Sequence, residues 1–334
     1  MPVSPQKISL FLVVVTFFSF QIQAQVNAFV FSPSLLSRRH LSKATQLYKT
    51  KEDASVSSSE NVLSRREIII LGIGGTAYAK IVASAISKIK RGDAYPPEHE
   101  DRVSRIFERT ILEATSSASS SRPLRVLEVG IGDKCRTIVR GLYDGTLSSL
   151  TKMDNPPKIE MMGIDIDAPS DDVVKSANQH LSDKFPSLPI SFSAMEGDIV
   201  QGLKMFPDGY FDAITSSLVL CSVSDQMEAL KEIKRLLNPD GGTFGFIEHV
   251  AVNIENKEEK SLSFLELQQR VLDPLQQAVA HNCHLHRQTD AVISSAFGVD
   301  ASEQATLLDT ERFLCKEMWP VSLQCCGVVK VISK

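Results

Sequence analysis

The stretch PLRVLEVGIGDKC, residues 123–135, decides the fold class. An apolar run ends at Glu128 and Val129, two glycines follow, and a polar segment then predicts the start of a helix. Glycines at this turn let the backbone approach a ligand without an intervening Cβ, although a simple tight turn is the alternative for this motif alone. Cys135 stands where a dinucleotide-binding fold would have a third glycine or alanine, which disfavours a pyrophosphate cradle.

Further apolar segments repeat the pattern of the first one. Helical stretches such as SDQMEALKEIKRLLNP separate some of them. The segments predicted to be strands are KIEMMGIDID (158–167), PISFSAMEGD (189–198), GYFDAITSSLVL (209–220) and GGTFGFIEHV (241–250). Strands that alternate with helices predict an α/β protein with a doubly wound, mostly parallel sheet. We therefore expect a ligand at the carboxyl ends of the strands.

The ends of these strands carry residues suited to a nucleoside. Asp165 ends the second strand, where a carboxylate can accept hydrogen bonds from both ribose hydroxyls. Asp198 and Ile199 end the third strand and supply an acceptor and an apolar wall for an adenine ring. Ser217 and Leu218 end the fourth strand and line the floor. With Glu128, Gly130 and Gly132 in the first turn, this order predicts a zwitterionic nucleoside ligand.

Here the chain resembles the class I S-adenosylmethionine methyltransferases, from about residue 100 to the end. Residues 216–250, SSLVLCSVSDQMEALKEIKRLLNPDGGTFGFIEHV, and 271–289, VLDPLQQAVAHNCHLHRQT, resemble more closely the methyltransferase-like 7 family of membrane-associated alkyl thiol methyltransferases. That family pairs LVLCSV and a Gly-Gly turn with EHV, LDP and a C-N-L-x-R element. The resemblance implies a seven-stranded Rossmann-like sheet and S-adenosylmethionine as cofactor.

Two departures from that family bear on the ligands. GIGDKC replaces the usual Gly-x-Gly-Thr-Gly loop, which should affect cofactor affinity modestly. His284 stands where the family has Asn, which leaves the identity of the methyl acceptor open.

The resemblance also implies that residues 251–289 fold over the site as an acceptor lid. Within it, 261–277 is expected to be helical, and Cys283, His284, His286 and Arg287 are expected to face the acceptor. His249, at the end of the fifth strand, is a candidate base or electrostatic partner for a thiol, and Asp273 is a candidate to orient it. A structural histidine is the alternative for His249. A zinc site from Cys283, His284 and His286 is disfavoured by crowding, so no metal is expected.

The predicted function is methyl transfer to a small-molecule acceptor, for which a thiol is the first choice. Methyl transfer from a sulfonium is an in-line displacement, so the protein mainly positions donor and acceptor and excludes water. A quinone or phenol O- or C-methyltransferase and a non-catalytic adenosylmethionine-binding protein are the alternatives. The missing third glycine disfavours a nicotinamide oxidoreductase.

Charge excludes some partners. Residues 1–66 carry eight Lys or Arg and three Asp or Glu, whereas the rest of the chain carries 28 basic and 37 acidic residues. An acidic domain argues against nucleic-acid binding, which needs a basic surface. Six cysteines without a CxxC motif favour a reducing compartment over a disulfide framework. No obligate protein partner is evident.

The N-terminal region predicts targeting. The run ISLFLVVVTFFSF, Phe29 after Ala28, and the basic, acid-free segment that follows together resemble the bipartite plastid presequences of algae with secondary plastids, so residues 1–66 are expected to direct the chain to a plastid. Residues 67–93, preceded by Arg65 and Arg66, predict a basic anchor on a stromal or thylakoid membrane surface, hence peripheral membrane association. A helix packed on the domain and a twin-arginine signal into the thylakoid lumen are the alternatives for residues 67–93, and plain secretion is the alternative for the presequence. Residues 94–334 then form the methyltransferase domain.

Overall fold

The computed structural model describes Tyr78, Lys80, residues 82–84, Ser87 and then residues 95–117, 122–299 and 305–332. The chain divides into two compact units, residues 1–85 and 86–334. The predicted presequence lies outside the described residues, and of the predicted anchor only a few helical residues are described. No helix within the described ranges is long and apolar enough to cross a membrane. The targeting and anchor predictions therefore stay predictions.

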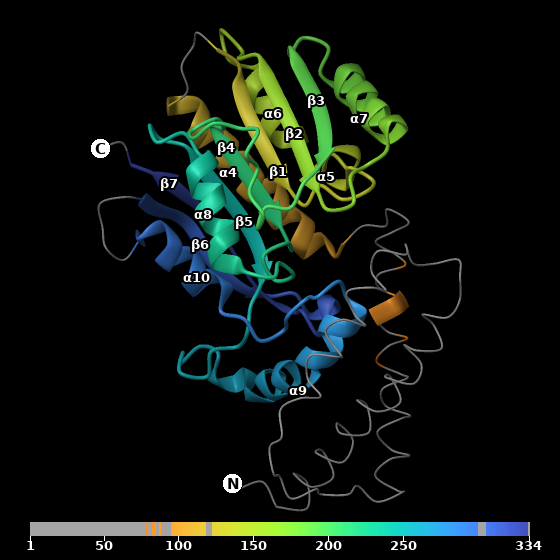
Figure 1. Cartoon of the computed structure of the whole chain (residues 1–334), viewed down its shortest axis with the longest axis vertical. Helices are drawn as coiled ribbons and strands as arrows, with labels where there is room; N and C mark the ends of the chain where they lie inside the picture. Colours follow the sequence, from red (N-terminus) through yellow and green to blue (C-terminus); the bar gives the residue numbers. More distant parts are fainter. Residues whose placement is uncertain are drawn as a thin grey trace, which may run out of the picture. The chain divides into compact units, whose positions relative to one another are not determined.

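A seven-stranded sheet forms the centre of the second unit (Figure 1). Its strands are β1 (Leu124–Val129), β2 (Ile159–Asp165), β3 (Ile190–Glu196), β4 (Ala213–Ser217), β5 (Thr243–His249), β6 (Ala305–Leu314) and β7 (Leu323–Val331). Their spatial order is β3-β2-β1-β4-β5-β7-β6. The first five strands are parallel, and β7 is antiparallel to both β5 and β6. The predicted doubly wound, mostly parallel seven-stranded sheet is confirmed.

Helices cover both faces of the sheet. One face packs against α4 (Pro97–Ser117), α5 (Arg136–Val139), α6 (Asp144–Thr151) and α7 (Asp171–Lys184). The other face packs against α8 (Gln226–Leu236) and α10 (Thr289–Phe297), so α4 and α8 lie on opposite faces in Figure 1. The helix α9 (Ser263–Val279) belongs to the predicted acceptor lid, and 3-10 turns form at Lys260–Leu262 and Lys316–Met318.

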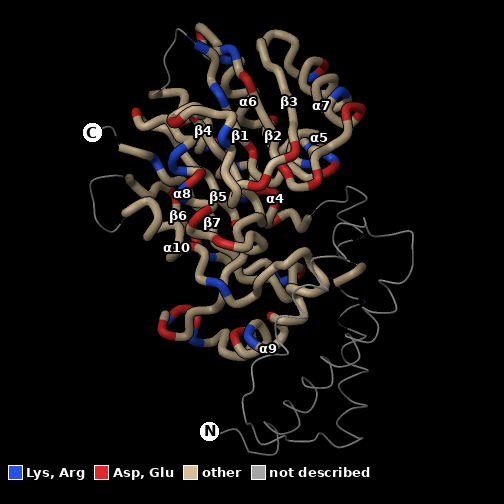
Figure 2. Tube along the Cα trace, in the orientation of Figure 1, with Lys and Arg blue, Asp and Glu red and all other residues tan. Residues whose placement is uncertain are grey.

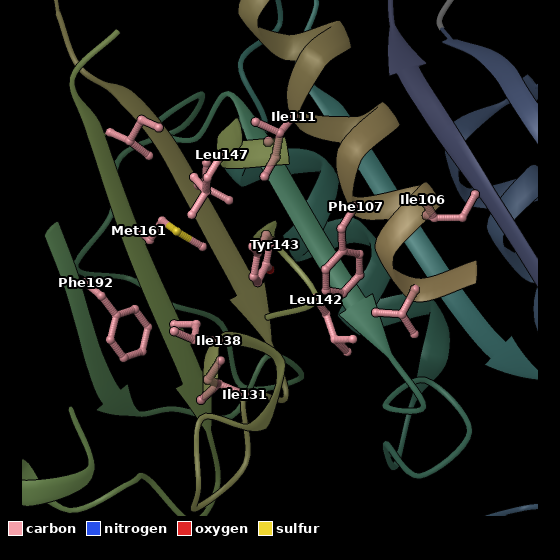
Figure 3. Packing of buried hydrophobic residues seen from close by; sticks show 14 of the residues in the cluster. Ile106, Phe107, Ile111, Ile131, Ile138, Leu142, Tyr143, Leu147, Met161 and Phe192 are labelled. Atoms are coloured by element: carbon pink, nitrogen blue, oxygen red, sulfur yellow. The ribbon is translucent and has the colours of Figure 1, made fainter. Parts of the chain in front are cut away.

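The helix α4 packs closely on the sheet because its apolar residues recur on one face. Ile106, Phe107 and Ile111 are almost fully buried, and Figure 3 shows Phe107 beside Tyr143, with 5.1 Å between ring centroids. Each such side chain contributes about 1.5–3 kcal/mol by burial. Gly245 in β5 permits this approach, since a Cβ there would lie 2.0 Å from the hydroxyl oxygen of Thr110.

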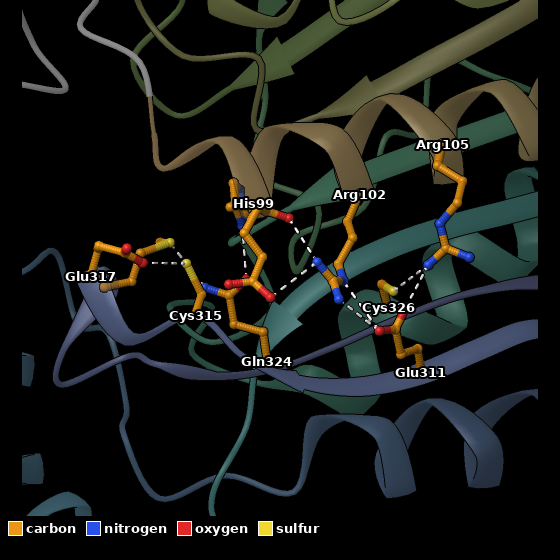
Figure 4. Close-up of polar contacts among 10 residues, drawn as sticks. His99, Arg102, Arg105, Glu311, Cys315, Glu317, Gln324 and Cys326 are labelled. Carbon is orange, nitrogen blue, oxygen red and sulfur yellow. Dashed lines mark hydrogen bonds and ion pairs between the residues drawn. The ribbon is translucent and has the colours of Figure 1, made fainter.

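Polar contacts fix the same helix to the far strands (Figure 4). Arg102 and Arg105 both donate to the Glu311 carboxylate, at 2.8 and 2.7 Å. These partly exposed ion pairs are worth little individually. His99 is fully buried, and its Nδ1 lies 2.8 Å from Oε1 of Gln324. Burial lowers the pKa of His99 to about 4, so it is neutral and serves packing.

The order of the strands locates the ligand site. From β1 the chain continues to β2 and β3 on one side and then returns to β4 on the other side. This reversal lies between β1 and β4, and such a switch point opens a crevice at the carboxyl ends of both strands. The glycine turn after β1 and the loop after β4 therefore border the expected crevice.

Candidate active site

The two glycines after β1 have different surroundings. Both have positive φ, 80° at Gly130 and 72° at Gly132, which favours glycine. A Cβ on Gly130 would lie 2.2 Å from Cγ2 of Val219 in the loop after β4. A Cβ on Gly132 would meet nothing within 4 Å. Gly130 therefore packs the two loops together, and Gly132 is the glycine that borders open space for a ligand.

Cys135 takes the place of the glycine missing from this loop. It precedes α5 with φ 46°, the left-handed conformation that a glycine would adopt without strain. Its side chain is buried, and burial raises the pKa of the thiol to about 12. Cys135 is therefore an unreactive packing residue, and the loop keeps its turn despite the substitution.

Glu128 was expected to contact the cofactor, and the structure corrects this. Its carboxyl is buried beneath the glycine loop, where Oε2 accepts hydrogen bonds from the hydroxyls of Thr137 and Tyr143, each at 2.8 Å. Burial raises the pKa of Glu128 to about 7. A sequence cannot distinguish this internal bond from a ligand contact, because both require an acid at the end of β1.

Replacement of this acid tests its raised pKa. The folded state binds the Glu128 proton more tightly than the unfolded state does. The protonated carboxyl therefore stabilises the fold fully below pH 4.5, and this stabilisation is lost as pH rises to about 7. Glu128→Gln carries no such loss. Relative to the wild type, its free energy of unfolding should rise by on the order of 3 kcal/mol between pH 4.5 and 8. Urea unfolding at both pH values measures this. The control is Glu160→Gln on β2, and equal pH dependence in the Glu128→Gln variant and the wild type would contradict the prediction.

The Asp165 carboxylate is held at the end of β2 by two backbone N–H groups. The backbone N–H of Gly132 donates to its Oδ2 at 2.9 Å, and that of Asp167 donates to its Oδ1 at 3.0 Å. These bonds fix the carboxylate beside the open space at Gly132. Burial raises the pKa of Asp165, although the two N–H groups partly offset this. Its neighbour Ile166 is 57% exposed, an apolar surface at the same strand end that the sequence analysis did not identify.

The end of β3 differs in part from its prediction. Asp198 lies there, and its Oδ1 accepts a hydrogen bond from the N–H of Val200 at 2.9 Å. Ile199 was expected to form an open wall for an adenine ring. It is only 4% exposed and packs in the core beneath α8, so Ile166 offers far more apolar surface than Ile199 does.

The loop after β4 is held by one buried acid. Leu218 has φ 57°, and its N–H donates to the carbonyl of Ile247 at 2.8 Å. Oε1 of Glu248 accepts from the hydroxyl of Ser216 and from the N–H groups of Val219 and Leu220, each at 3.0 Å. Its Oε2 accepts from the N–H of Cys221 at 3.2 Å. Ser217 ends β4 and Leu218 begins this loop, and their predicted contact with a ligand stays a prediction. The sequence analysis did not identify Glu248, although it belongs to the EHV motif.

His249 lies beside two cysteines. Its ring is 1% exposed, and Nε2 lies 2.6 Å from the carbonyl oxygen of His284, to which it donates. Both ring nitrogens lie 3.9 Å from Sγ of Cys283. Burial lowers the pKa of His249, but the nearby Cys283 sulfur outweighs this and the net pKa is raised. The carbonyl contact fixes the imidazole without help from a carboxylate.

Asp273 was expected to orient His249, and the structure corrects this. Its Oδ1 accepts from the N–H groups of Leu285 and His286, at 2.5 and 3.2 Å, and its Oδ2 accepts from the Gln277 amide at 2.6 Å. Asp273 therefore stabilises the turn that carries the lid residues. These hydrogen bonds account for the Asp273 carboxylate without a role in proton transfer.

Arg287 and the two lid histidines have separate partners. The Arg287 guanidinium donates to the carbonyls of residues 220, 221 and 223, at 3.1, 3.3 and 2.8 Å. It thus joins the lid to the loop after β4 instead of facing an acceptor. Nδ1 of His284 lies 3.9 Å from Oδ2 of Asp273, and Nε2 of His286 lies 3.5 Å from Oε1 of Glu266. The structure therefore does not bring Cys283, His284 and His286 together as one metal site.

The predicted acceptor lid carries charged residues of both signs. Figure 2 marks the positions of Asp, Glu, Lys and Arg along α9 and the loop before it. Its inner side is buried, with Leu265, Leu272 and Leu275 each at most 9% exposed. An amphipathic helix placed in this way can exclude water from what it covers.

Comparison with known proteins supports the assignment of the domain. Residues 145–244 match the family model described as methyltransferase domain. Thiol S-methyltransferase TMT1B of Rattus norvegicus is 37% identical over 89 residues, which cover 27% of this chain and 33% of that protein. Thiol S-methyltransferase TMT1A of Homo sapiens is 35% identical over 89 residues, with the same two shares. The chain thus spans about a third of the length of the curated relatives it matches.

Solved structures give a weaker likeness. A SAM-dependent methyltransferase from Methanosarcina mazei is 15% identical, with a TM-score of 0.42 over 66% of this chain and 97% of that one. The family model and the strand order agree with the sequence analysis. Residues 145–244 therefore form part of a methyltransferase domain.

Proposed function

We propose that this methyltransferase domain transfers the methyl group of S-adenosylmethionine to the sulfur of a small-molecule thiol. The observation that carries the donor part is the Asp165 carboxylate, held by two backbone N–H groups beside the open space at Gly132. The similarity to thiol S-methyltransferases supports the acceptor part.

The residues at the strand ends fit the donor. The Asp165 carboxylate keeps lone pairs for the two ribose hydroxyls, because a carboxylate offers about four acceptor sites and the backbone uses two. Ile166 presents an apolar surface suited to one face of an adenine ring. Gly132 leaves room where any side chain would intrude on the ligand. S-adenosylmethionine supplies the electrophilic methyl group, and these residues bind and orient it.

The acceptor region lies where the lid meets the ends of β4 and β5. Arg287 joins the two segments through three carbonyls, and the N–H of His284 donates to the carbonyl of Cys221 at 2.9 Å. A displacement at a methyl group needs the acceptor sulfur aligned behind it and water excluded. A lid fixed to the donor loop serves both needs.

The acceptor class is tested with the purified full-length chain and methyl-labelled S-adenosylmethionine. Small alkyl thiols should become S-methylated, and the rate should rise with pH through the pKa of each thiol, which is about 8.5 for a cysteine-like thiol, to a plateau above it, because the thiolate is the nucleophile. Thiols of lower pKa should reach the plateau at lower pH. Mass spectrometry of the product identifies the methylated atom.

Matched acceptors keep the test decisive. Phenols and quinones assayed under the same conditions should give much slower transfer. Faster transfer to oxygen or carbon would overturn the thiol assignment and favour the O- or C-methyltransferase. Binding of the donor without transfer to any acceptor class would favour a non-catalytic adenosylmethionine-binding protein.

A further inference from the structure

Three side chains with metal-binding atoms meet in the interior of the domain. Cys221 comes from the loop after β4, His249 ends β5, and Cys283 follows α9. Their ligand atoms all lie within 4.8 Å of one another. The residues are only 2%, 1% and 8% exposed. Two sulfurs and an imidazole, which are ligands that zinc favours, thus come together from three separate segments.

The surroundings orient these atoms towards one another. Because Nε2 of His249 donates to the carbonyl of His284, its Nδ1 carries the free lone pair. A backbone carbonyl that fixes the tautomer in this way is the usual partner of a metal-bound histidine. The Gln276 amide donates to Sγ of Cys283 at 3.5 Å, and Sγ of Cys221 lies 3.5 Å from the Ser222 hydroxyl. Each sulfur therefore has a polar neighbour within the buried cluster.

We propose that Cys221, His249 and Cys283 form a binding site for one thiophilic divalent cation, with Zn²⁺ as the ion of choice. Zinc binds sulfur at about 2.3 Å and imidazole nitrogen at about 2.0–2.1 Å, and tetrahedral geometry then places sulfur and nitrogen about 3.5 Å apart. The present separation of 3.9 Å between Sγ of Cys283 and Nδ1 needs to contract by only a few tenths of an ångström.

Charge and coordination number agree with this ion. Two thiolates and a neutral imidazole carry two negative charges, so Zn²⁺ neutralises a cluster that would be costly to bury as bare thiolates. Three protein ligands leave one tetrahedral position for an exogenous ligand, as in catalytic rather than structural zinc sites. This inference departs from the expectation that the chain binds no metal. The sequence analysis did not find the site because its ligands are spread over 63 positions of the sequence, from 221 to 283.

The test of this site needs neither an activity assay nor the identity of the methyl acceptor. The untagged full-length chain is reduced, freed of metal with a chelator and titrated with Zn²⁺. We expect one equivalent to bind, and Co²⁺ in its place to show the absorption bands of cobalt bound to thiolate in tetrahedral geometry. Cys221→Ala and Cys283→Ala should each weaken binding by more than about 10²-fold, since loss of an outer partner alone costs 10- to 100-fold.

Cys325→Ala is the matched control, because Cys325 is equally buried in β7 and outside the cluster. It should bind zinc as the wild type does. Failure of the reduced wild type to bind zinc would overturn the proposal, and so would unchanged binding in both cluster variants. A Cys221–Cys283 disulfide in protein purified without reductant, with no metal uptake after reduction, would likewise overturn it. Where a variant fails to fold, the cobalt spectrum of the wild type still tests the proposal, because absence of the thiolate bands would contradict it.

Discussion

Asp165→Ala is expected to weaken S-adenosylmethionine binding by about 10²-fold or more. The carboxylate is fixed by the N–H groups of Gly132 and Asp167 and borders the open space at Gly132. Loss of two charge-assisted hydrogen bonds to the ribose, each worth about 1.5–3 kcal/mol, corresponds to about two to four decades in the dissociation constant. Calorimetric titration with S-adenosylmethionine, or with its demethylated product, measures the change.

Two further variants separate this role from general effects. Asp167→Asn removes a neighbouring charge but keeps the backbone N–H that holds Asp165, so its affinity should stay within about threefold of the wild type. Asp165→Asn keeps the shape of the side chain but has one acceptor oxygen, and it should fall between the wild type and the alanine variant. Normal affinity in folded Asp165→Ala protein would show that the ribose binds elsewhere.

Donor affinity should also fall as the medium becomes acidic. Burial raises the pKa of Asp165, so its charge is lost at higher pH than for an ordinary aspartate. Protonation replaces an acceptor by a donor on one oxygen, which weakens the contact with a ribose hydroxyl. The acidic loss of affinity should therefore be absent from Asp165→Ala.

The fold could be predicted because local sequence and topology agree. The segments that end at Val129, Asp165 and Ser217 are apolar, are interrupted by turn residues and alternate with helices, which leaves a parallel sheet as the simplest arrangement. The family resemblance implied seven strands, but the antiparallel position of β7 between β5 and β6 was not predicted. Nothing local to Cys325 and Cys326 in that strand encodes the direction of pairing.

The candidate site was predictable in place but only partly in detail. Asp165 and Gly132 lie where the order of the strands required them, since parallel strands bring their carboxyl ends to one edge. Glu128 and Ile199 are buried, although both were predicted to contact the ligand. The sequence does not state whether a residue at a strand end points towards a ligand or into the core. Side-chain direction there depends on the turn that follows.

The lid was the least predictable part. The sequence analysis expected Cys283, His284 and His286 to face the acceptor together, because they are close in the sequence. The structure gives them separate partners: Cys283 lies beside His249, His284 beside Asp273 and His286 beside Glu266. The cluster that does form joins Cys283 to Cys221 and His249, and only the tertiary fold could reveal it.

Glu248→Ala is expected to destabilise the domain by on the order of 3–5 kcal/mol. Glu248 is fully buried and accepts hydrogen bonds from the Ser216 hydroxyl and from three consecutive N–H groups at residues 219–221. A buried donor left without an acceptor costs about 1–3 kcal/mol, and water entering the cavity recovers part of the sum. Urea unfolding, with the midpoint and slope compared between variants, measures the loss.

Glu248→Gln is the matched control that identifies the cause. An amide oxygen at the position of Oε1 keeps three of the four acceptor contacts, whereas the amide nitrogen faces the N–H of Cys221, so the loss should be only about 1–2 kcal/mol. Because Val219 in the same loop packs against Gly130, the alanine variant should also bind S-adenosylmethionine more weakly, and the glutamine variant should bind it nearly normally. Equal destabilisation by both substitutions would mean that the negative charge, rather than the accepted hydrogen bonds, holds the loop after β4.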